Sequence, residues 1–464
     1  MTRVDAPAQV SDALINACAH FSVIPNNRST HKTRVIKPTA AMINRVRESS
    51  VVQIVGPSGA GKSSLLRGII ESLPSGRTRI VPESLSTEQM SIAVFDLLTG
   101  ESDEPASSLS LAGLAEPQLW ARPAGALSVG EMARLRFAMT MHRAQRGDIV
   151  IADEFASTVD RACAYALSRT IRRWAQRLGI TLIAASAHED LERMLAPDLV
   201  IDAQTSRIRD AVEPESQAIA IEQGTLEDYQ QLEYLHYRSG KPATIVQTLR
   251  AMREVPRHID PTCRMLAGVL LISMPMLNGV WRKRAWAGHL VTRDKATNAA
   301  RLNAQVRMIS RVIVEPRSRG LGIATKLVRA YLDDPITPGS EAYAAMGSVC
   351  PFFERAGMTP YEIVPDLPDT RLLDALTYMT IAPEQLLRTQ IEPGSLLMRE
   401  LVTWGKVRKL LPSGKPNIEE VQRLTPIAAC RLCSRPRAYA FVKGGWGDEY
   451  SNRTHAQGTA RSSG

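Results

Sequence analysis

The first half of the chain alternates short apolar runs with longer amphipathic stretches. The runs VVQIVG (51–56), DIVIAD (148–153), TLIAASA (181–187) and LVIDAQ (199–204) have the length and composition of buried strands. Residues 160–179 have helical periodicity and end at a glycine, and a further helix is expected from Lys62. This alternation predicts an α/β fold with a mostly parallel sheet covered on both faces.

Changes in polarity along the chain predict where its domains begin and end. The expected division is a polar lead-in with one helix at 10–19, a first α/β domain, an acidic linker, a second mixed α/β domain and a basic tail whose end is disordered. The corresponding ranges are 1–48, 49–211, 212–224, 225–402 and 403–464.

The composition narrows the classes of protein that fit. In 464 residues, 44% are hydrophobic and 22% are charged, as in ordinary soluble globular proteins. No apolar stretch is long enough to span a bilayer, and the N-terminus lacks the pattern of a secretory signal. Six cysteines do not make a disulfide framework. We therefore expect a cytoplasmic, reduced protein with no membrane partner.

The positive charge is concentrated in the second half. Residues 1–224 hold 24 Lys and Arg against 25 Asp and Glu, whereas residues 225–464 hold 33 against 22. This asymmetry favours a polyanionic partner for residues 225–464, DNA more than RNA. A generic basic surface is the alternative.

One glycine-rich turn has a specific pattern. GPSGAGKS, at 56–63, fits G-x-x-x-x-G-K-[ST] between an expected strand and an expected helix. Backbone amides in such a turn surround phosphate oxygens, the lysine reaches the outer phosphates, and the serine hydroxyl ligates Mg²⁺. The expected contacts to ATP are Gly56, Ser58, Gly59, Gly61, Lys62, Ser63 and Ser64.

Acidic residues at a strand end supply the other half of this site. Asp153, with Ser63, is expected to hold Mg²⁺, and Glu154 to orient or deprotonate the attacking water. LSVGEMARLRFAM (127–139) precedes these acids, and Asp160 and His188 follow them.

This ordered set, over about residues 20–210, resembles the nucleotide-binding domain of ABC-type ATPases. The resemblance assigns Lys62 and Ser63 to Walker A, Asp153 and Glu154 to Walker B, and Asp160 to the D-loop. It makes His188 the catalytic switch histidine, and Ser128, Gly130 and Glu131 the signature motif. It implies use of ATP and Mg²⁺ by an ATP-dependent homodimer, in which the signature of one copy faces Walker A of the other. Only about 70 residues separate the two motifs, which favours a small helical subdomain and disfavours transport.

A second glycine turn is of a different kind. A strand expected at 308–314 is followed by Arg317-x-x-Gly320-x-Gly322 and an amphipathic helix, without Gly-Lys-Ser/Thr. This resembles the acyl-CoA-binding motif of GNAT acyltransferases. The resemblance implies that amides of residues 318–323 hold the pyrophosphate of acetyl-CoA or another acyl-CoA. The implied contacts are Val314, Arg317, Arg319, Gly320, Gly322, Ile323 and Ala324.

YAAMGSVCPFFERAGMTPYEI (343–363) resembles the next conserved block of that family. Phe353 stands where many members have a tyrosine that protonates the leaving thiolate. Cys350 and Tyr361 are therefore alternative acids, and core packing is favoured for Phe352 and Phe353.

The segment LHYRSGKPAT (235–244) is the candidate acceptor side. His236 or Tyr237 could serve as a general base near neutral pH, and Arg238 and Lys241 could clamp phosphate. A capped helix end with solvated polar groups is the alternative. Together with the fused architecture, this segment resembles ABC-ATPase–GNAT fusions whose acyltransferase part is similar to phage Mom-type enzymes, which modify adenine in DNA.

The end of the chain is basic and contains interleaved aromatic residues. Residues 401–464 hold 11 Lys and Arg against 4 Asp and Glu, interleaved with Trp404, Tyr439, Phe441, Trp446 and Tyr450. Such a tail could follow a phosphate backbone and stack on bases. Cys430 and Cys433, with His455 nearby, form half of a zinc site at most, and two ordinary cysteines are the favoured interpretation.

The leading hypothesis is an ATP-dependent acyltransferase that acts on nucleic acid. Two alternatives remain: an ABC-type ATPase that regulates an acyltransferase with a protein or small-molecule acceptor, and a non-catalytic switch that only binds acyl-CoA.

Overall fold

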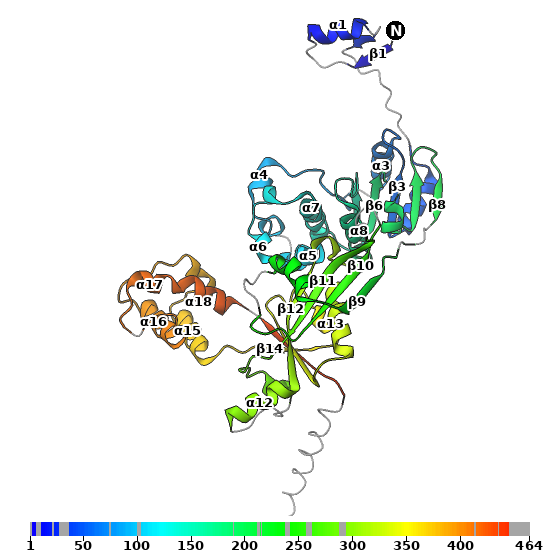
Figure 1. The fold of residues 1–464 in the computed structure, drawn as a ribbon. Coiled ribbons are helices and arrows are strands. Elements are labelled where there is room, and N and C mark those ends of the chain that lie inside the picture. The colour runs from blue at the N-terminus through cyan, green and yellow to red at the C-terminus, as the bar shows by residue number, and fades with distance from the viewer. Residues whose placement is uncertain are drawn as a thin grey trace, which may run out of the picture. The chain divides into compact units, whose positions relative to one another are not determined.

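The computed structural model divides the chain into two compact units, Met1–Ser216 and Gln217–Gly464, each described separately below (Figure 1). The described residues are 2–5, 11–20, 23–26, 37–73, 76–99, 104–188, 190–210, 214, 216–236, 242–256, 262–286, 294–412, 414–434 and 436–444. No helix within these ranges combines the length and the apolarity needed to cross a membrane.

The first unit is built on a six-stranded sheet in the order β4-β5-β6-β3-β7-β8. The pairs are parallel except for β7 with β8. This confirms the predicted α/β fold with a mostly parallel sheet. The strands are β3 (Val51–Val55), β4 (Thr78–Ile80), β5 (Ile149–Ala152), β6 (Thr181–Ser186), β7 (Leu199–Asp202) and β8 (Ile208–Asp210).

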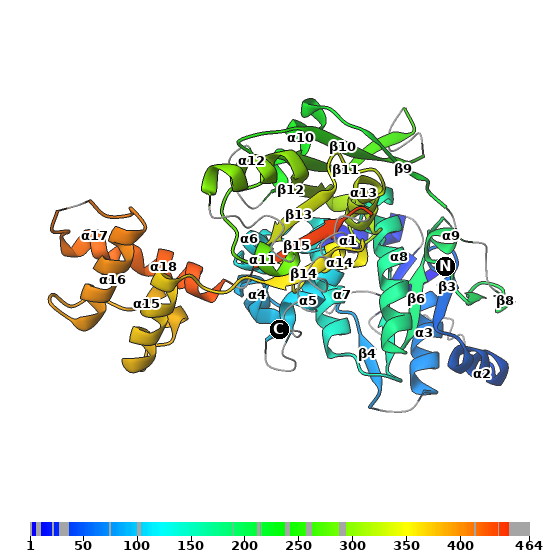
Figure 2. The same cartoon turned by 90° about the horizontal axis from the view of Figure 1, so that it is seen from below.

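Helices cover both faces of this sheet, with α8 on one side and α2 and α3 on the other (Figure 2). Helix α8 has a broad buried face and ends at Gly179, which has the left-handed conformation common at helix C-termini. The helices are α2 (Ala40–Glu48), α3 (Lys62–Glu71), α4 (Thr87–Ser91), α5 (Pro105–Leu111), α6 (Pro117–Trp120), α7 (Val129–Arg143), α8 (Arg161–Leu178) and α9 (Leu191–Leu195).

The predicted lead-in is more structured than expected. The expected helix is α1 (Asp12–His20), and it lies between the parallel strands β1 (Thr2–Asp5) and β2 (Val23–Asn26). Helix α2, also within 1–48, buries Met42 and Val46 in the same core as Ile54 of β3. The first domain therefore begins before residue 49, because α2 supplies part of its core.

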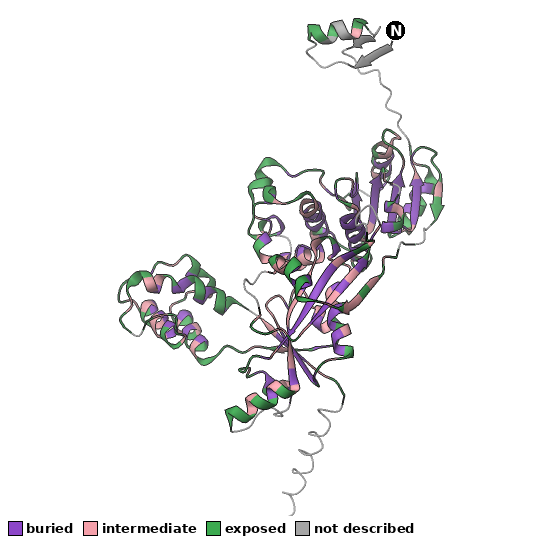
Figure 3. Ribbon diagram, viewed as in Figure 1, coloured by how far each residue is buried: buried purple, intermediate pink, exposed green. Residues whose placement is uncertain are grey.

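The second unit contains a seven-stranded sheet in the order β14-β15-β13-β12-β11-β10-β9. The pair β12 and β13 is parallel, and the other neighbours are antiparallel. Interior strands of both sheets are largely buried, among them β3, β5 and β6 in the first sheet and β11 and β13 in the second (Figure 3). The strands are β9 (Ile219–Gln223), β10 (Gln247–Glu254), β11 (Arg264–Ser273), β12 (Val306–Val314), β13 (Gly339–Ala344), β14 (Thr359–Glu362) and β15 (Arg437–Val442).

Two apolar layers sandwich this second sheet. Leu270 of β11 belongs to the cluster that contains α13 residues, whereas its neighbour Leu271 packs with Tyr229 of α10. Because successive strand residues point to opposite faces, α13 and α10 cover opposite sides. The helices are α10 (Leu226–Leu232), α11 (Arg282–Ala285), α12 (Lys295–Gln305), α13 (Ile323–Asp333), α14 (Phe352–Arg355), α15 (Leu367–Tyr378), α16 (Leu396–Val407), α17 (Ile418–Gln422) and α18 (Leu424–Cys433).

Two predicted boundaries differ from the structure. The boundary between 402 and 403 falls inside α16, whose Leu401 and Trp404 share a core with α15 and α18. Helices α15–α18 thus form a module inserted between β14 and β15, and β15 is an interior strand of the sheet. The linker predicted at 212–224 contains β9, the edge strand. Both errors arise from reading polar composition as a connection, although half-exposed strands and surface helices are equally polar.

Candidate functional site

The first glycine turn joins a fully buried strand, β3, to α3. Gly56, Gly59 and Gly61 have φ values of 147°, 78° and 93°, which side chains rarely adopt. Gly61 is the residue immediately before the helix, so its left-handed conformation starts α3 with exposed Ser63 in the first turn. Amides at this point carry the positive end of the helix dipole, which favours an anion.

Lys62 closes over this turn. Its ammonium group donates to the carbonyl oxygens of Gly56 and Pro57, at 2.9 and 3.0 Å. The charge is therefore held beside the same loop whose amides bind phosphate in such turns. Ser58 is exposed and Ser64 is partly buried. All the predicted contacts lie on the exposed or partly exposed loop and the first helical turn.

The acid pair follows β5. The Glu154 amide donates to Asp153 Oδ1 at 2.9 Å, and Glu154 has a left-handed φ of 48°. The Phe155 amide donates to the Ala185 carbonyl of β6 at 2.8 Å. This backbone bond ties the acidic tip to the neighbouring strand and leaves the Glu154 side chain exposed.

Strand order brings the two halves of the site together. Strand β6 lies between β3 and β5, and all three run parallel, so their carboxyl ends share one edge of the sheet. His188 follows β6 at this edge, and its amide donates to Ser186 Oγ at 3.1 Å. The topology thus places His188 after the strand that lies between the strands of the glycine turn and the acid pair.

The remaining motif residues begin helices. Ser128 precedes α7 and forms a capping box with Glu131, whose carboxylate accepts from the Ser128 amide and hydroxyl, both at 2.8 Å. Gly130 lies in the first turn of α7, with Cys163 3.6 Å from where its side chain would begin. Asp160 caps α8 by accepting from the Cys163 amide at 2.9 Å.

Comparison with known proteins identifies this unit. A family model described as Novel STAND NTPase 1 matches residues 36–209. The zinc import ATP-binding protein ZnuC of Ruegeria sp. (strain TM1040) is 30% identical over 169 residues, covering 34% of this chain and 67% of that protein. Through this region the chain belongs to the ABC-type ATPases.

Two further similar proteins are covered to different extents. The sn-glycerol-3-phosphate import ATP-binding protein UgpC 1 of Rhizobium johnstonii is 28% identical over 198 residues, 37% of this chain and 53% of that protein. The solved structure of cbiO1 from Clostridium perfringens, part of the ABC transporter complex cbiONQ, is 19% identical, with a TM-score of 0.29 over 35% of this chain and 77% of that one. The ATPase thus spans about two thirds or less of the curated relatives.

The second glycine turn of the ATPase chain lies between β12 and α13. Gly320 and Gly322 have φ values of 84° and 79°, and Gly322 directly precedes the helix, whose first residues are Ile323 and Ala324. Arg317 donates to Glu315 at 2.7 Å and Arg319 to the Val314 carbonyl at 3.2 Å. The turn thus has the same glycine-started helix as the first.

A fully buried arginine on another strand of the same sheet supports this turn. Arg253 of β10 donates to the Arg317 carbonyl and to Ser318 Oγ, both at 3.2 Å, and to Gln217 Oε1 at 2.7 Å. Sequence reasoning missed Arg253, because nothing in the local pattern of β10 shows which loop its side chain reaches.

Strands β12 and β13 diverge beside the turn. Their pairing ends at Ile309 with Ala342, whereas β12 continues to Val314 on β11 and β13 continues to Ala344 on β15. A bulge at Ser310 accompanies the change of direction. The β13-facing backbone of residues 310–314 therefore belongs to no strand ladder in the described sheet.

The structure does not bring the candidate proton-transfer residues together in one described cluster. His236 is half-buried after α10, where its amide donates to the Glu233 carbonyl at 3.0 Å. Tyr237, Arg238 and Lys241 lie outside the described residues. Phe353 is buried against Tyr439, with ring centroids 5.0 Å apart, which agrees with core packing. Tyr361 packs against Trp281 in a different cluster.

Three of the five aromatic residues assigned to a tail belong instead to folded cores. Trp404 and Tyr439 are buried, and Phe441 packs against the α13 cluster. Burial and the neighbouring Glu354 raise the pKa of Tyr439 to about 12. Trp446, Tyr450 and His455 lie outside the described residues. Cys430 and Cys433 are exposed on α18, and no cluster of three metal-ligating side chains occurs in the described ranges.

Proposed function

We propose that the ATPase unit hydrolyses ATP as an ATP-dependent homodimer and controls an acyl-CoA-dependent N-acyltransferase in the second unit, which modifies nucleic acid. The observation that carries the acyltransferase is the coincidence of the diverging strands β12 and β13 with the glycine turn at Arg317–Gly322. This arrangement supports a GNAT-like fold, because that fold requires both the divergence of the two parallel strands and the glycine turn after the first of them.

In this proposal, two sets of protein groups bind the acyl donor. Amides of residues 318–323 at the start of α13 bind the pyrophosphate. Arg253 stabilises that turn by donating to the Arg317 carbonyl. Residues 310–314 offer backbone donors and acceptors along the open edge of β12 to the amides of the pantetheine arm. A diphosphate attached to a peptide-like arm is therefore the chemistry that fits.

Transfer to an amine requires two proton movements. The acceptor nitrogen attacks the thioester carbonyl, the C–S bond breaks, and the acyl group ends on nitrogen. His236 takes the proton from the amine in this proposal, because an imidazole changes charge near neutral pH. The thiolate of CoA gains a proton from water or from a side chain such as Cys350, since Phe353 has no acidic group.

The transfer itself needs no ATP, so the ATPase has a mechanical or gating role. Ser63 and Asp153 would hold Mg²⁺, which neutralises phosphate charge. Glu154 orients the attacking water. His188 follows β6, which lies between the strand before the glycine turn and the strand before the acid pair. A base inside a duplex must leave the stack before its exocyclic amine can react. Closing of the homodimer on ATP is a suitable source of that work.

The charge distribution supports a nucleic acid acceptor. The second unit carries the whole basic excess of the chain, whereas the first is close to neutral. One observation favours the alternative of a protein or small-molecule acceptor: Trp404 and Tyr439 are buried and leave no base-stacking tail among the described residues.

The decisive experiment incubates the purified chain with acetyl-CoA, ATP, Mg²⁺ and duplex DNA, then digests the DNA to nucleosides for mass spectrometry. We expect an acylated nucleoside that depends on all four components and is absent with Gly320→Glu. Acylation of a polyamine or peptide in the same mixture, with unmodified nucleosides from DNA and RNA, would transfer the proposal to the other acceptor class.

A further inference from the structure

An exposed apolar loop follows β11. Met276, Leu277 and Val280 expose 47%, 61% and 81% of their surface. We call residues 275–280 the wedge loop. Three large apolar side chains exposed within five residues mark an interaction site more often than an ordinary surface, where such residues are scattered.

The wedge loop is held rigidly at its base. Arg282, 5% exposed, donates to both oxygens of the fully buried Glu341, at 2.6 and 2.7 Å. The same guanidinium donates to the Met276 and Leu277 carbonyls, at 2.5 and 3.4 Å. These hydrogen bonds hold the loop backbone at two consecutive residues whose apolar side chains are exposed.

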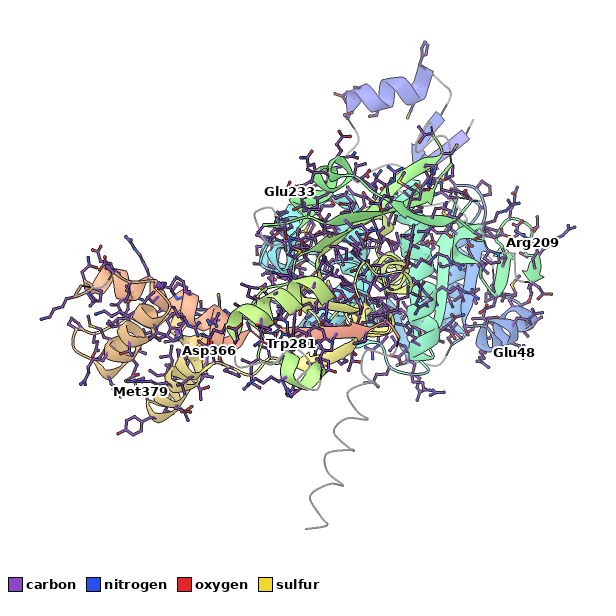
Figure 4. All side chains as sticks on the ribbon, turned by 60° about the horizontal axis from the view of Figure 1, so that its bottom comes forward. Glu48, Arg209, Glu233, Trp281, Asp366 and Met379 are labelled. Atoms are coloured by element: carbon purple, nitrogen blue, oxygen red, sulfur yellow. The ribbon has the colours of Figure 1, made fainter. Side chains whose placement is uncertain are left out.

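Close packing under Gly279 fixes the loop further. A methyl group added there would lie 2.9 Å from the Tyr343 hydroxyl and 3.0 Å from the Arg282 guanidinium. Trp281, labelled in Figure 4, donates to the same Tyr343 hydroxyl and packs on its ring, with centroids 5.6 Å apart. The loop is therefore seated directly on β13.

Basic residues are frequent in the chain segment that contains the wedge loop. Residues 274–305 contain six Lys and Arg and one acid, Asp294. Lys283 and Arg284 follow the loop on α11 and are exposed, although Arg284 also donates to the Glu362 carbonyl at 2.5 Å. Lys295 and Arg301 are exposed on α12. An apolar loop that is followed along the chain by exposed cations matches a polymer with charged phosphates outside and apolar base faces inside.

The position of the loop relates it to the acyl donor. Glu341 and Tyr343, its two anchors, lie on β13, which diverges from β12 after Ala342. The loop follows β11 and is thus anchored by side-chain contacts on the strand that forms one side of the proposed donor site. Proteins that kink or open a duplex insert residues such as Met and Leu between base steps.

We propose that the wedge loop inserts Leu277 and Val280 between base pairs of duplex DNA, while Lys283, Lys295 and Arg301 contact the phosphates. The insertion unstacks the nucleotide that the transferase modifies. The identity of that nucleotide as acceptor rests on the proposed function, but binding and unstacking of a duplex do not.

The test uses the full-length chain without ATP or acyl-CoA and a duplex that carries 2-aminopurine, whose fluorescence rises when the base unstacks. The variant is Leu277→Ser with Val280→Ser. The matched control is Tyr378→Ser with Leu387→Ser, two residues of the α15–α18 module that are 80% and 58% exposed. Fluorescence anisotropy of a labelled duplex measures affinity in parallel.

We expect the wild type and the control to raise 2-aminopurine fluorescence equally, and the wedge variant to lose most of the rise while its affinity changes only a few-fold. Lys283→Gln should lower the slope of log affinity against log salt by about 0.9, the value for one phosphate contact, with little effect on fluorescence.

Three results would overturn the proposal. The first is no duplex binding or no fluorescence rise with the wild type. The second is an unchanged rise with the wedge variant. The third is binding to phosphatidylserine vesicles that the wedge variant abolishes, without duplex unstacking, which would make the loop a membrane anchor. Unstacking without acylated nucleosides would leave this proposal standing and refute the proposed function alone.

Discussion

The two glycine turns of this chain have similar backbones and different charges. Each starts a helix with a left-handed glycine, Gly61 in one and Gly322 in the other. The next residue is Lys62 in the first turn and Ile323 in the second. Both turns place the first backbone amides of a helix at the turn, and Lys62 adds to the first turn a cation that Ile323 does not supply to the second.

The turns also differ in what supports them. The sheet beneath the second turn contributes Arg253, whose hydrogen bonds reach the turn itself. The strand before the first turn buries Gln53, and in the described structure neither atom of its amide has a hydrogen-bond partner. A buried side chain thus bonds to the second turn, whereas the strand before the first turn carries a buried amide without a partner. The predictions below test this difference and the separate ligands.

The largest effect is expected from Glu154→Gln. Removing the group that activates water should lower ATP hydrolysis by about 10²–10⁴-fold, the usual contribution of a general base. ATP binding should persist, because Lys62 and the turn are untouched, so the variant should accumulate as a dimer in size-exclusion chromatography with ATP. A strict monomer at saturating ATP would contradict the paired arrangement of the first turn.

Gly320→Glu should weaken acetyl-CoA binding by at least about 100-fold, because opposing like charges cost several kcal/mol. Isothermal titration calorimetry should show ATP binding unchanged. Gly320→Ala, which adds strain at a φ of 84° but no charge, is the control and should bind more tightly than the glutamate variant. Equal loss in both variants would mean that shape, and not a bound anion, accounts for the effect.

Lys62→Ala should have the reciprocal result. Losing a charge-assisted bond of about 1.5–3 kcal/mol should weaken ATP binding by roughly 10–100-fold. Acetyl-CoA affinity, measured by the same calorimetry, should stay at the wild-type value. Loss of both ligands would show that the two turns are coupled sites.

Much of the first turn and of the sheet around it could be predicted from local sequence. The glycines, Lys62, and the acids after β5 lie within continuous motifs, because a phosphate site needs residues in one loop and at neighbouring strand ends. The mostly parallel order of the first sheet likewise follows from alternation of strand and helix. These features depend on short-range geometry that a pattern records.

The supports of the turns could not be predicted, because they depend on long-range pairing. Arg253 is 64 residues from the Arg317 carbonyl that it holds. Strand β15 follows an inserted helical module and pairs with β13. Without knowledge of that pairing, Tyr439 of β15 is interpreted as an aromatic residue of a tail. Periodicity reports which face is apolar, but not which strands become neighbours.

Arg253→Met should produce a smaller, mixed effect. The substitution leaves the Arg317 carbonyl, Ser318 and Gln217 without a buried donor, and each such loss costs about 1–3 kcal/mol. Thermal melting should shift down, and acetyl-CoA affinity should fall while ATP affinity does not. Arg264→Met on β11 is the control. Its exposed pair with Glu222 should contribute about 0–1 kcal/mol. An equal shift in both variants would remove the special role of Arg253.

Gln53→Met tests the unsatisfied side of the comparison and should have the smallest effect. Gln53 is 0% exposed, and methionine keeps its length without donors or acceptors. Because a buried unpaired polar group costs about 1–3 kcal/mol, the variant should be more stable by roughly 1 kcal/mol in chemical denaturation, with unchanged ATP binding. The matched control is Gln422→Met. Its amide accepts from Ile391 at 2.9 Å and donates to the Thr389 carbonyl at 2.9 Å, so the same substitution should destabilise. Destabilisation at both positions would mean that Gln53 is satisfied in solution, by a water or by a shift of α8, and that the two turns do not differ in their support.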